Sequence, residues 1–122
     1  MIAPLLMRTS VVFLLIGMCA GVVMGITQSF NYASAHAHFN LLGGVLMFVA
    51  GLYYHVFKSA GADAMAKWQA GLHIAGAIVL PCGVAAIQAG GPSYEIVAIA
   101  GSLIMIAAMV LFVTLVFRYS RL

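Results

Sequence analysis

Four long apolar stretches, separated by short segments that hold most of the charged side chains, dominate this sequence. A membrane-spanning helix needs about 20 consecutive apolar residues, since lipid offers no hydrogen-bond partners to its backbone. Only 6% of the 122 residues are charged, whereas a soluble domain contains roughly 25%. The pattern predicts an all-α integral membrane protein, a four-transmembrane-helix bundle that forms one domain over residues 1–122.

The boundaries of the helices follow from the charged and turn-forming residues. A polar turn follows the first stretch, Lys58 and Lys67 border the second loop, and Gly90-Gly91-Pro92 marks the third turn. Pro81 is expected to kink the third helix. We therefore expect helices at about residues 7–27, 34–57, 68–89 and 96–117.

The basic residues predict the orientation of these helices in the membrane. With four spans, all five fall on the same side, and the loops on the other side contain none: Arg8, Lys58, Lys67, Arg118 and Arg121. Loops rich in Lys and Arg stay in the cytoplasm, so both termini are predicted to be cytoplasmic. A formal charge of +3 is too small to indicate nucleic-acid binding, and the expected surroundings are the lipid bilayer.

The second stretch begins with an unusual polar sequence, Ser34 to Gly44 (SAHAHFNLLGG). Ionisable side chains in a membrane are costly and mark functional sites, which singles out His36 and His38. At about 100° per residue, the two imidazoles point about 200° apart on an α-helix. Each is therefore expected to meet a different neighbour.

The two faces of this helix differ in character. The face of His36 carries Asn40, Gly43, Met47 and Tyr54, which suits packing or a cofactor. The face of His38 is apolar, with Leu42, Val45, Val49, Leu52 and Val56. This apolar face contacts lipid in a monomer, with His38 at the headgroups, or a second subunit or a porphyrin in an oligomer.

The other two histidines are predicted at a different depth. Counted from Lys58 at about 1.5 Å per residue, the His36 level lies roughly 30 Å from the cytoplasmic edge. His73 is then roughly 20 Å from that level, too far to share a small metal site. His55 and His73 lie at similar depth on neighbouring helices and are able to approach each other.

Three further features have both a functional and a structural explanation. Gly17, Gly21 and Gly25 form a small-xxx-small pattern that predicts close approach of another helix, although glycine is common in membrane helices. The two cysteines, Cys19 and Cys82, lie in apolar stretches and are interpreted as packing residues. Because no Cys-x-x-Cys-His occurs, covalent c-type haem is excluded.

The His-x-His stretch, with Gly51 to Phe57 (GLYYHVF) after it, resembles a helix of the catalytic subunit I of haem–copper oxidases. Residues 68–81, from Trp68 through His73 to Pro81, are similar to the following helix of that family. The chain is also similar to short four-helix bacterial proteins that carry His-Ala-His-x-Asn-Leu-Leu-Gly. These resemblances imply a multi-pass protein of the bacterial inner (cytoplasmic) membrane.

In that family the first histidine of the pair ligates a high-spin haem and the second a low-spin haem on the opposite face. The resemblance thus implies that His36 and His38 are haem-iron ligands. The oxidase fold consists of three four-helix arcs around a pseudo-threefold axis, so a homotrimer of this chain is preferred over a homodimer. Each interface would bind one haem b between His36 of one protomer and His38 of the next.

Departures from the family limit the implied activity. The chain has about a third of the family's helices, no second histidine pair for copper and no recognisable cross-linked tyrosine motif. Electron transfer or redox or haem sensing, with an unidentified redox partner, is therefore expected rather than oxygen reduction by a complete oxidase.

Two neighbouring residues complete the expected site. Met24 is a conceivable sixth iron ligand, because methionine serves that role in cytochromes, although it also fills gaps in apolar cores. Asn40, one turn from His36, is expected to orient the imidazole or a propionate, or to hydrogen-bond between helices.

Two other functions remain open. A copper-binding membrane protein is the first, because soft methionine and borderline histidine ligands suit copper. The second is a cofactor-free structural or assembly subunit of a respiratory complex, in which the histidines serve packing and interfaces.

Overall fold

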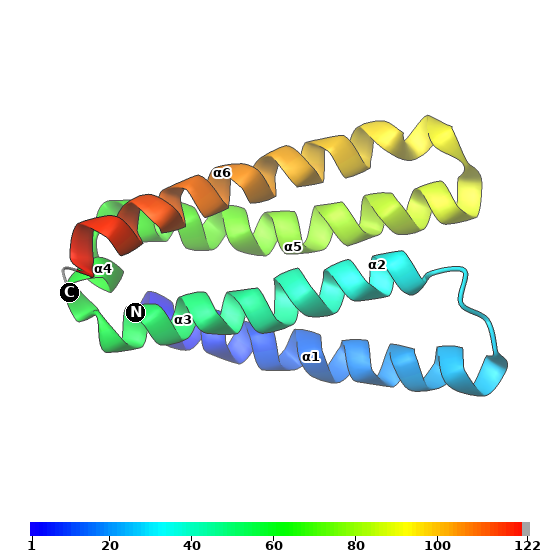
Figure 1. Ribbon diagram of the computed structural model, residues 1–122, viewed down its shortest axis with the longest axis horizontal. Helices are drawn as coiled ribbons and strands as arrows, with labels where there is room; N and C mark the ends of the chain where they lie inside the picture. The colour runs from blue at the N-terminus through cyan, green and yellow to red at the C-terminus, as the bar shows by residue number, and fades with distance from the viewer. Residues whose placement is uncertain (121–122) are drawn as a thin grey trace.

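The computed structural model describes residues 1–120 as four long helices that run antiparallel, side by side (Figure 1). All four are long and apolar enough to cross a membrane, and they occupy residues Ile2–Thr27, Ala33–Val56, Ala64–Gly90 and Pro92–Tyr119. The expectation of an all-α, four-helix, multi-pass membrane protein is thus confirmed.

The secondary-structure elements divide these spans further. The first span is α1 (Ile2–Thr27), and the second consists of α2 (Ala33–His38), a π-helix η1 (Phe39–Leu46) and α3 (Met47–Val56). A short helix, α4 (Lys58–Ala62), leads into α5 (Ala64–Gly90). After a 3₁₀ turn, η2 (Pro92–Tyr94), the chain ends with α6 (Glu95–Tyr119).

Two helices begin earlier than the sequence predicts, because contacts at their first turns extend them. Helix α1 begins at Ile2 rather than near residue 7, and its first turns bury Ile2 and Leu6 against the protein. Helix α5 begins at Ala64 rather than near residue 68, since the Asp63 carboxylate accepts a hydrogen bond from the Met65 N–H at 2.9 Å.

The helices pack in the order in which they occur along the chain (Figure 1). Helix α1 packs against the second span, α2 and η1 pack against α5, and α6 packs along α5. Small residues allow the backbones of α5 and α6 to approach closely: a Cβ added at Gly83 would lie 2.7 Å from the Ala98 Cα.

The predicted glycine face of α1 is used at two of its three positions. A Cβ at Gly17 would collide with the Asn40 side chain, and one at Gly21 would lie 3.1 Å from the His36 Cε1. A Cβ at Gly25 would meet no atom within 4 Å. The glycines therefore make room for side chains of the second span rather than for its backbone.

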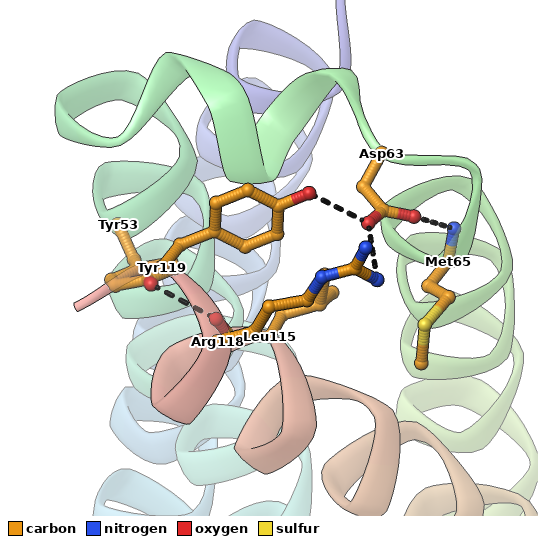
Figure 2. A network of polar contacts seen from close by, with 6 residues as sticks. All are labelled: Tyr53, Asp63, Met65, Leu115, Arg118 and Tyr119. Atoms are coloured by element: carbon orange, nitrogen blue, oxygen red, sulfur yellow. Dashed lines mark hydrogen bonds and ion pairs between the residues drawn. The ribbon is translucent and has the colours of Figure 1, made fainter. Parts of the chain in front are cut away.

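Both termini lie at the same end of the structure (Figure 1), where a polar network joins the helices (Figure 2). The Tyr119 hydroxyl donates to the Asp63 carboxylate at 2.9 Å, and Arg118 pairs with it at 3.3 Å. Nearby, the Tyr53 hydroxyl donates to the Leu115 carbonyl at 3.3 Å. These contacts tie α3, α5 and α6 together. Arg121, one of the five basic residues counted above, lies outside the described residues.

Candidate cofactor-binding site

An apolar cavity of about 480 Å³ lies between α1, α2 and α5, toward the end of the structure that is distant from the termini. Its volume falls in the range of roughly 300–1,000 Å³ that is usual for small-molecule and cofactor sites. Its larger and polar lining side chains include those of Met24, Tyr32, His36, Phe39, Pro81 and Cys82. Glycine and alanine residues supply much of the remaining surface.

His36 is half-buried in the wall of this cavity, between α1 and α2. The Asn40 amide nitrogen lies 3.2 Å from both ring nitrogens and also donates to the His36 carbonyl at 3.1 Å. Gly17 provides the space for Asn40, and Gly21 lies against the imidazole. Asn40 is thus placed to orient the ring, and its expected role beside an iron ligand stays a prediction.

His38 does not line this cavity. Its Nδ1 lies 2.8 Å from the Ser34 carbonyl, which accepts a hydrogen bond and therefore assigns the proton to Nδ1. In the neutral ring, Nε2 then carries the lone pair. Metal-ligating histidines characteristically donate their second ring N–H to a carbonyl or carboxylate in this way. Within one chain, only His36 of the two lines the cavity, and their predicted azimuths stay a prediction.

Met24 lies in the same cavity wall as His36. Its predicted role as a sixth iron ligand stays a prediction. Cys82 from α5 also lines the cavity. The sequence predicts a packing residue at this position, because nothing local indicates that this part of α5 faces α1 and α2.

His55 and His73 do not come together. His55 is exposed near the end of α3, whereas His73 is fully buried in α5. His73 Nε2 lies 3.0 Å from the Leu42 carbonyl, only one turn beyond His38. The separation of roughly 20 Å counted from the sequence is therefore too long. Because α5 begins at Ala64, inside the predicted loop, His73 lies further along the helix than the sequence count assumes. The length of the His73 side chain shortens the remaining distance.

His73 belongs to a buried network that the sequence does not predict. The Tyr54 hydroxyl donates to Gln69 Oε1 at 3.0 Å, and Gln69 Nε2 lies 3.1 Å from His73 Nδ1. A Gln-x-x-x-His spacing on an apolar helix places both side chains on one face, and this was the available signal. Within residues 1–120, no three His, Cys, Asp or Glu side chains are grouped to hold a metal ion.

Comparisons with protein-family models, with curated proteins and with solved structures found no match to this chain. They identify no family.

Proposed function

We propose that this protein is a membrane haem b protein that serves electron transfer, or redox or haem sensing. The observation that carries the proposal is the apolar cavity of about 480 Å³ with His36 in its wall and Asn40 against the ring. An imidazole in an otherwise apolar cavity suits a porphyrin, whose faces are apolar and whose iron takes nitrogen ligands. Bound haem b supplies one-electron redox chemistry.

The chain's own residues meet several requirements of such a site. Phe39 and Pro81 give the cavity apolar walls, which suit the apolar faces of a porphyrin. Asn40 restrains the His36 ring through its amide. His38 has its Nδ1 proton engaged by the Ser34 carbonyl, which leaves Nε2 as the ligating atom.

We place His36 and His38 in different protomers of a homotrimer, with a homodimer as the less favoured assembly. The exposed side chains of Val45, Val49 and Leu52 lie further along the second span than His38 and form the apolar face for a second subunit. Each interface then pairs His36 of one protomer with His38 of the next. With two histidine ligands the iron has no open position for a substrate, which favours electron transfer over turnover.

Met24 offers a different pairing, because it shares the cavity wall with His36 in the same chain. Ligation by His36 and Met24 needs no second protomer and does not involve His38. The two arrangements therefore predict different effects of replacing His38.

Absorption spectra of the detergent-purified protein, oxidised and dithionite-reduced, with pyridine haemochrome quantification, test the proposal. We expect a low-spin b-type spectrum near one haem per chain, and its loss in both His36→Ala and His38→Ala. His55→Ala, which changes an exposed histidine at the other end of the helix, is the matched control and keeps the haem. A colourless wild-type protein after haem-supplemented expression would refute the proposal.

Co-expression of the two variants tests ligation across an interface. A mixed oligomer contains interfaces at which the His38→Ala chain supplies His36 and the His36→Ala chain supplies His38. Haem binding should therefore return in the mixture, although neither variant binds haem alone. If His38→Ala alone retains haem, ligation within one chain by His36 and Met24 is favoured instead.

Copper binding is the second candidate, since a thioether, an imidazole and a thiol meet in one cavity: Met24, His36 and Cys82. Soft sulfur ligands favour copper(I). Metal analysis would then find copper without a Soret band. A cofactor-free subunit remains the third candidate, and it predicts that alanine at both His36 and His38 leaves spectrum, metal content and assembly unchanged.

For the orientation, we propose that both termini face the cytoplasm of a bacterial inner membrane. Helix α4, which begins at Lys58, lies at the same end as both termini (Figure 1), and Lys67 is in the first turn of α5, which follows it. Single cysteines at the exposed Ser93 and Ser59, in a background without Cys19 and Cys82, test this with a membrane-impermeant maleimide on intact cells. Labelling is expected at position 93 and not at position 59. The opposite pattern would reverse the orientation.

A further inference from the structure

The π-helix η1 begins directly after His38 and separates the histidine pair from α3. The Met47 N–H reaches back to the Leu42 carbonyl, an i→i+5 hydrogen bond. Such a turn holds one residue more than an α-helical turn, which corresponds to about 100° of rotation. The directions of His36 and His38 relative to the buried face of α3 therefore depend on this turn.

Contacts with α1 secure one side of the turn. Added Cβ atoms at Gly43 and Gly44 would collide with the Phe13 and Leu14 side chains, so these side chains occupy the surface that the glycines leave open. Phe13 also stacks on Phe39, with ring centroids 4.6 Å apart. These contacts fix where the turn lies, and they contribute no hydrogen bond to it.

The hydrogen bond to the turn comes from α5. A carbonyl oxygen only accepts, so the contact with Leu42 assigns a proton to His73 Nε2. In the neutral ring Nδ1 then accepts from Gln69 Nε2, and Gln69 Oε1 accepts from the Tyr54 hydroxyl. Gln69 and His73 are fully buried, and each contact has a donor and an acceptor.

We propose that Tyr54, Gln69 and His73 are positioning residues that hold the π-helical turn and thereby set the directions of His36 and His38. The carbonyl of Leu42 is the point of attachment: its π-type bond to Met47 leaves a lone pair for His73. Without that donor, the more common α-helical i→i+4 pattern is favoured. The inference rests on the proposed function only in calling the positioned pair haem ligands.

The size of the expected movement follows from helix geometry. A rotation of about 100° at a radius of roughly 5–6 Å displaces a side chain by about 8 Å. Residues before the turn move relative to α5, whereas residues after it keep their places. A displacement of this size takes the His36 ring away from Gly21 of α1 and out of the cavity wall.

Distances between pairs of nitroxide labels, measured by pulsed electron paramagnetic resonance, test the inference without any haem. One pair joins exposed positions 37 and 88, before the turn and on α5, in a background without Cys19 and Cys82. The reference pair joins exposed positions 52 and 67, which flank the network on α3 and α5. We expect His73→Phe to shift the first distance by several ångströms, up to about 8 Å, and to leave the second unchanged.

Three further variants sharpen the test. His73→Gln keeps an amide donor for the Leu42 carbonyl and should retain the wild-type distances, whereas His55→Phe is the matched control at an exposed position. His73→Leu replaces His73→Phe if the larger ring prevents folding. A folded apolar variant at position 73 with an unchanged 37–88 distance would overturn the inference.

The haem spectrum then separates this inference from the proposed function. If wild-type protein binds no haem but the 37–88 distance shifts in His73→Phe, the positioning role stands and the haem proposal fails. If wild-type protein binds haem and His73→Phe changes neither the distance nor the low-spin spectrum, the positioning role is refuted and the haem proposal stands.

Discussion

Replacement of Gly83 by alanine should destabilise the protein, because α5 and α6 touch at this residue. The added Cβ would lie 2.7 Å from the Ala98 Cα and 2.8 Å from the Val97 carbonyl carbon, both backbone atoms. Carbon atoms prefer separations of about 3.5–4.0 Å, so the helices must part by about 1 Å. Overpacking of this kind costs about 1–3 kcal/mol, a shift of roughly 5- to 150-fold in the unfolding equilibrium.

Gly71→Ala is the matched control, since it makes the same change on the same helix where a Cβ would meet nothing within 4 Å. There, alanine should be neutral or stabilise by up to about 1 kcal/mol through helix propensity. Unfolding of both variants in mixed detergent and sodium dodecyl sulfate, followed by circular dichroism, measures the difference. Equal stabilities for Gly83→Ala and Gly71→Ala would refute the close contact between α5 and α6.

Two further predictions concern the polar network at the terminal end (Figure 2). The Met65 N–H, the Tyr119 hydroxyl and the Arg118 guanidinium hold the pKa of the Asp63 carboxyl below its ordinary value of 3.8. Their contribution to stability is therefore present above pH 3.8 and is lost as the pH falls through the lowered folded-state pKa. Thermal unfolding between pH 7 and pH 3 should show this loss in the wild type and not in Asp63→Asn; parallel curves would contradict it. Tyr53→Phe removes the hydrogen bonds to the Leu115 carbonyl and the Ser120 hydroxyl. It should lower the free energy of unfolding in detergent by about 0.5–1.5 kcal/mol. Unchanged stability would show that these bonds contribute nothing.

The inward and outward faces of α3 were predictable from the sequence. Met47 and Tyr54, predicted to face a packing partner or a cofactor, are buried, whereas Val49 and Leu52, on the predicted apolar face, are exposed. The extra residue of η1 turns His36 and His38 by about 100° relative to α3, so the expectation that each histidine shares a face with these residues is wrong. The prediction for α3 succeeds because the choice of face depends on side-chain type and helical period. Both properties are local to the segment.

The π-helical turn and the buried network were not predictable in the same way. Gly43 and Gly44 indicate only that some neighbour approaches, and the sequence does not say that it is Phe13 and Leu14. Likewise, His73 lies 31 positions from Leu42, the residue whose carbonyl it meets. No periodicity connects two such positions.

The sequence by itself therefore determined four membrane-spanning helices and the inward and outward faces of α3. Lipid leaves the backbone no partners outside its own helix, so length and apolar composition suffice to specify each span. Only the tertiary structure decided that Cys82 and Met24 share a cavity with His36, and that His73 reaches the Leu42 carbonyl. These pairings depend on the depth and rotation at which the helices pack, which are set jointly by side chains on different spans.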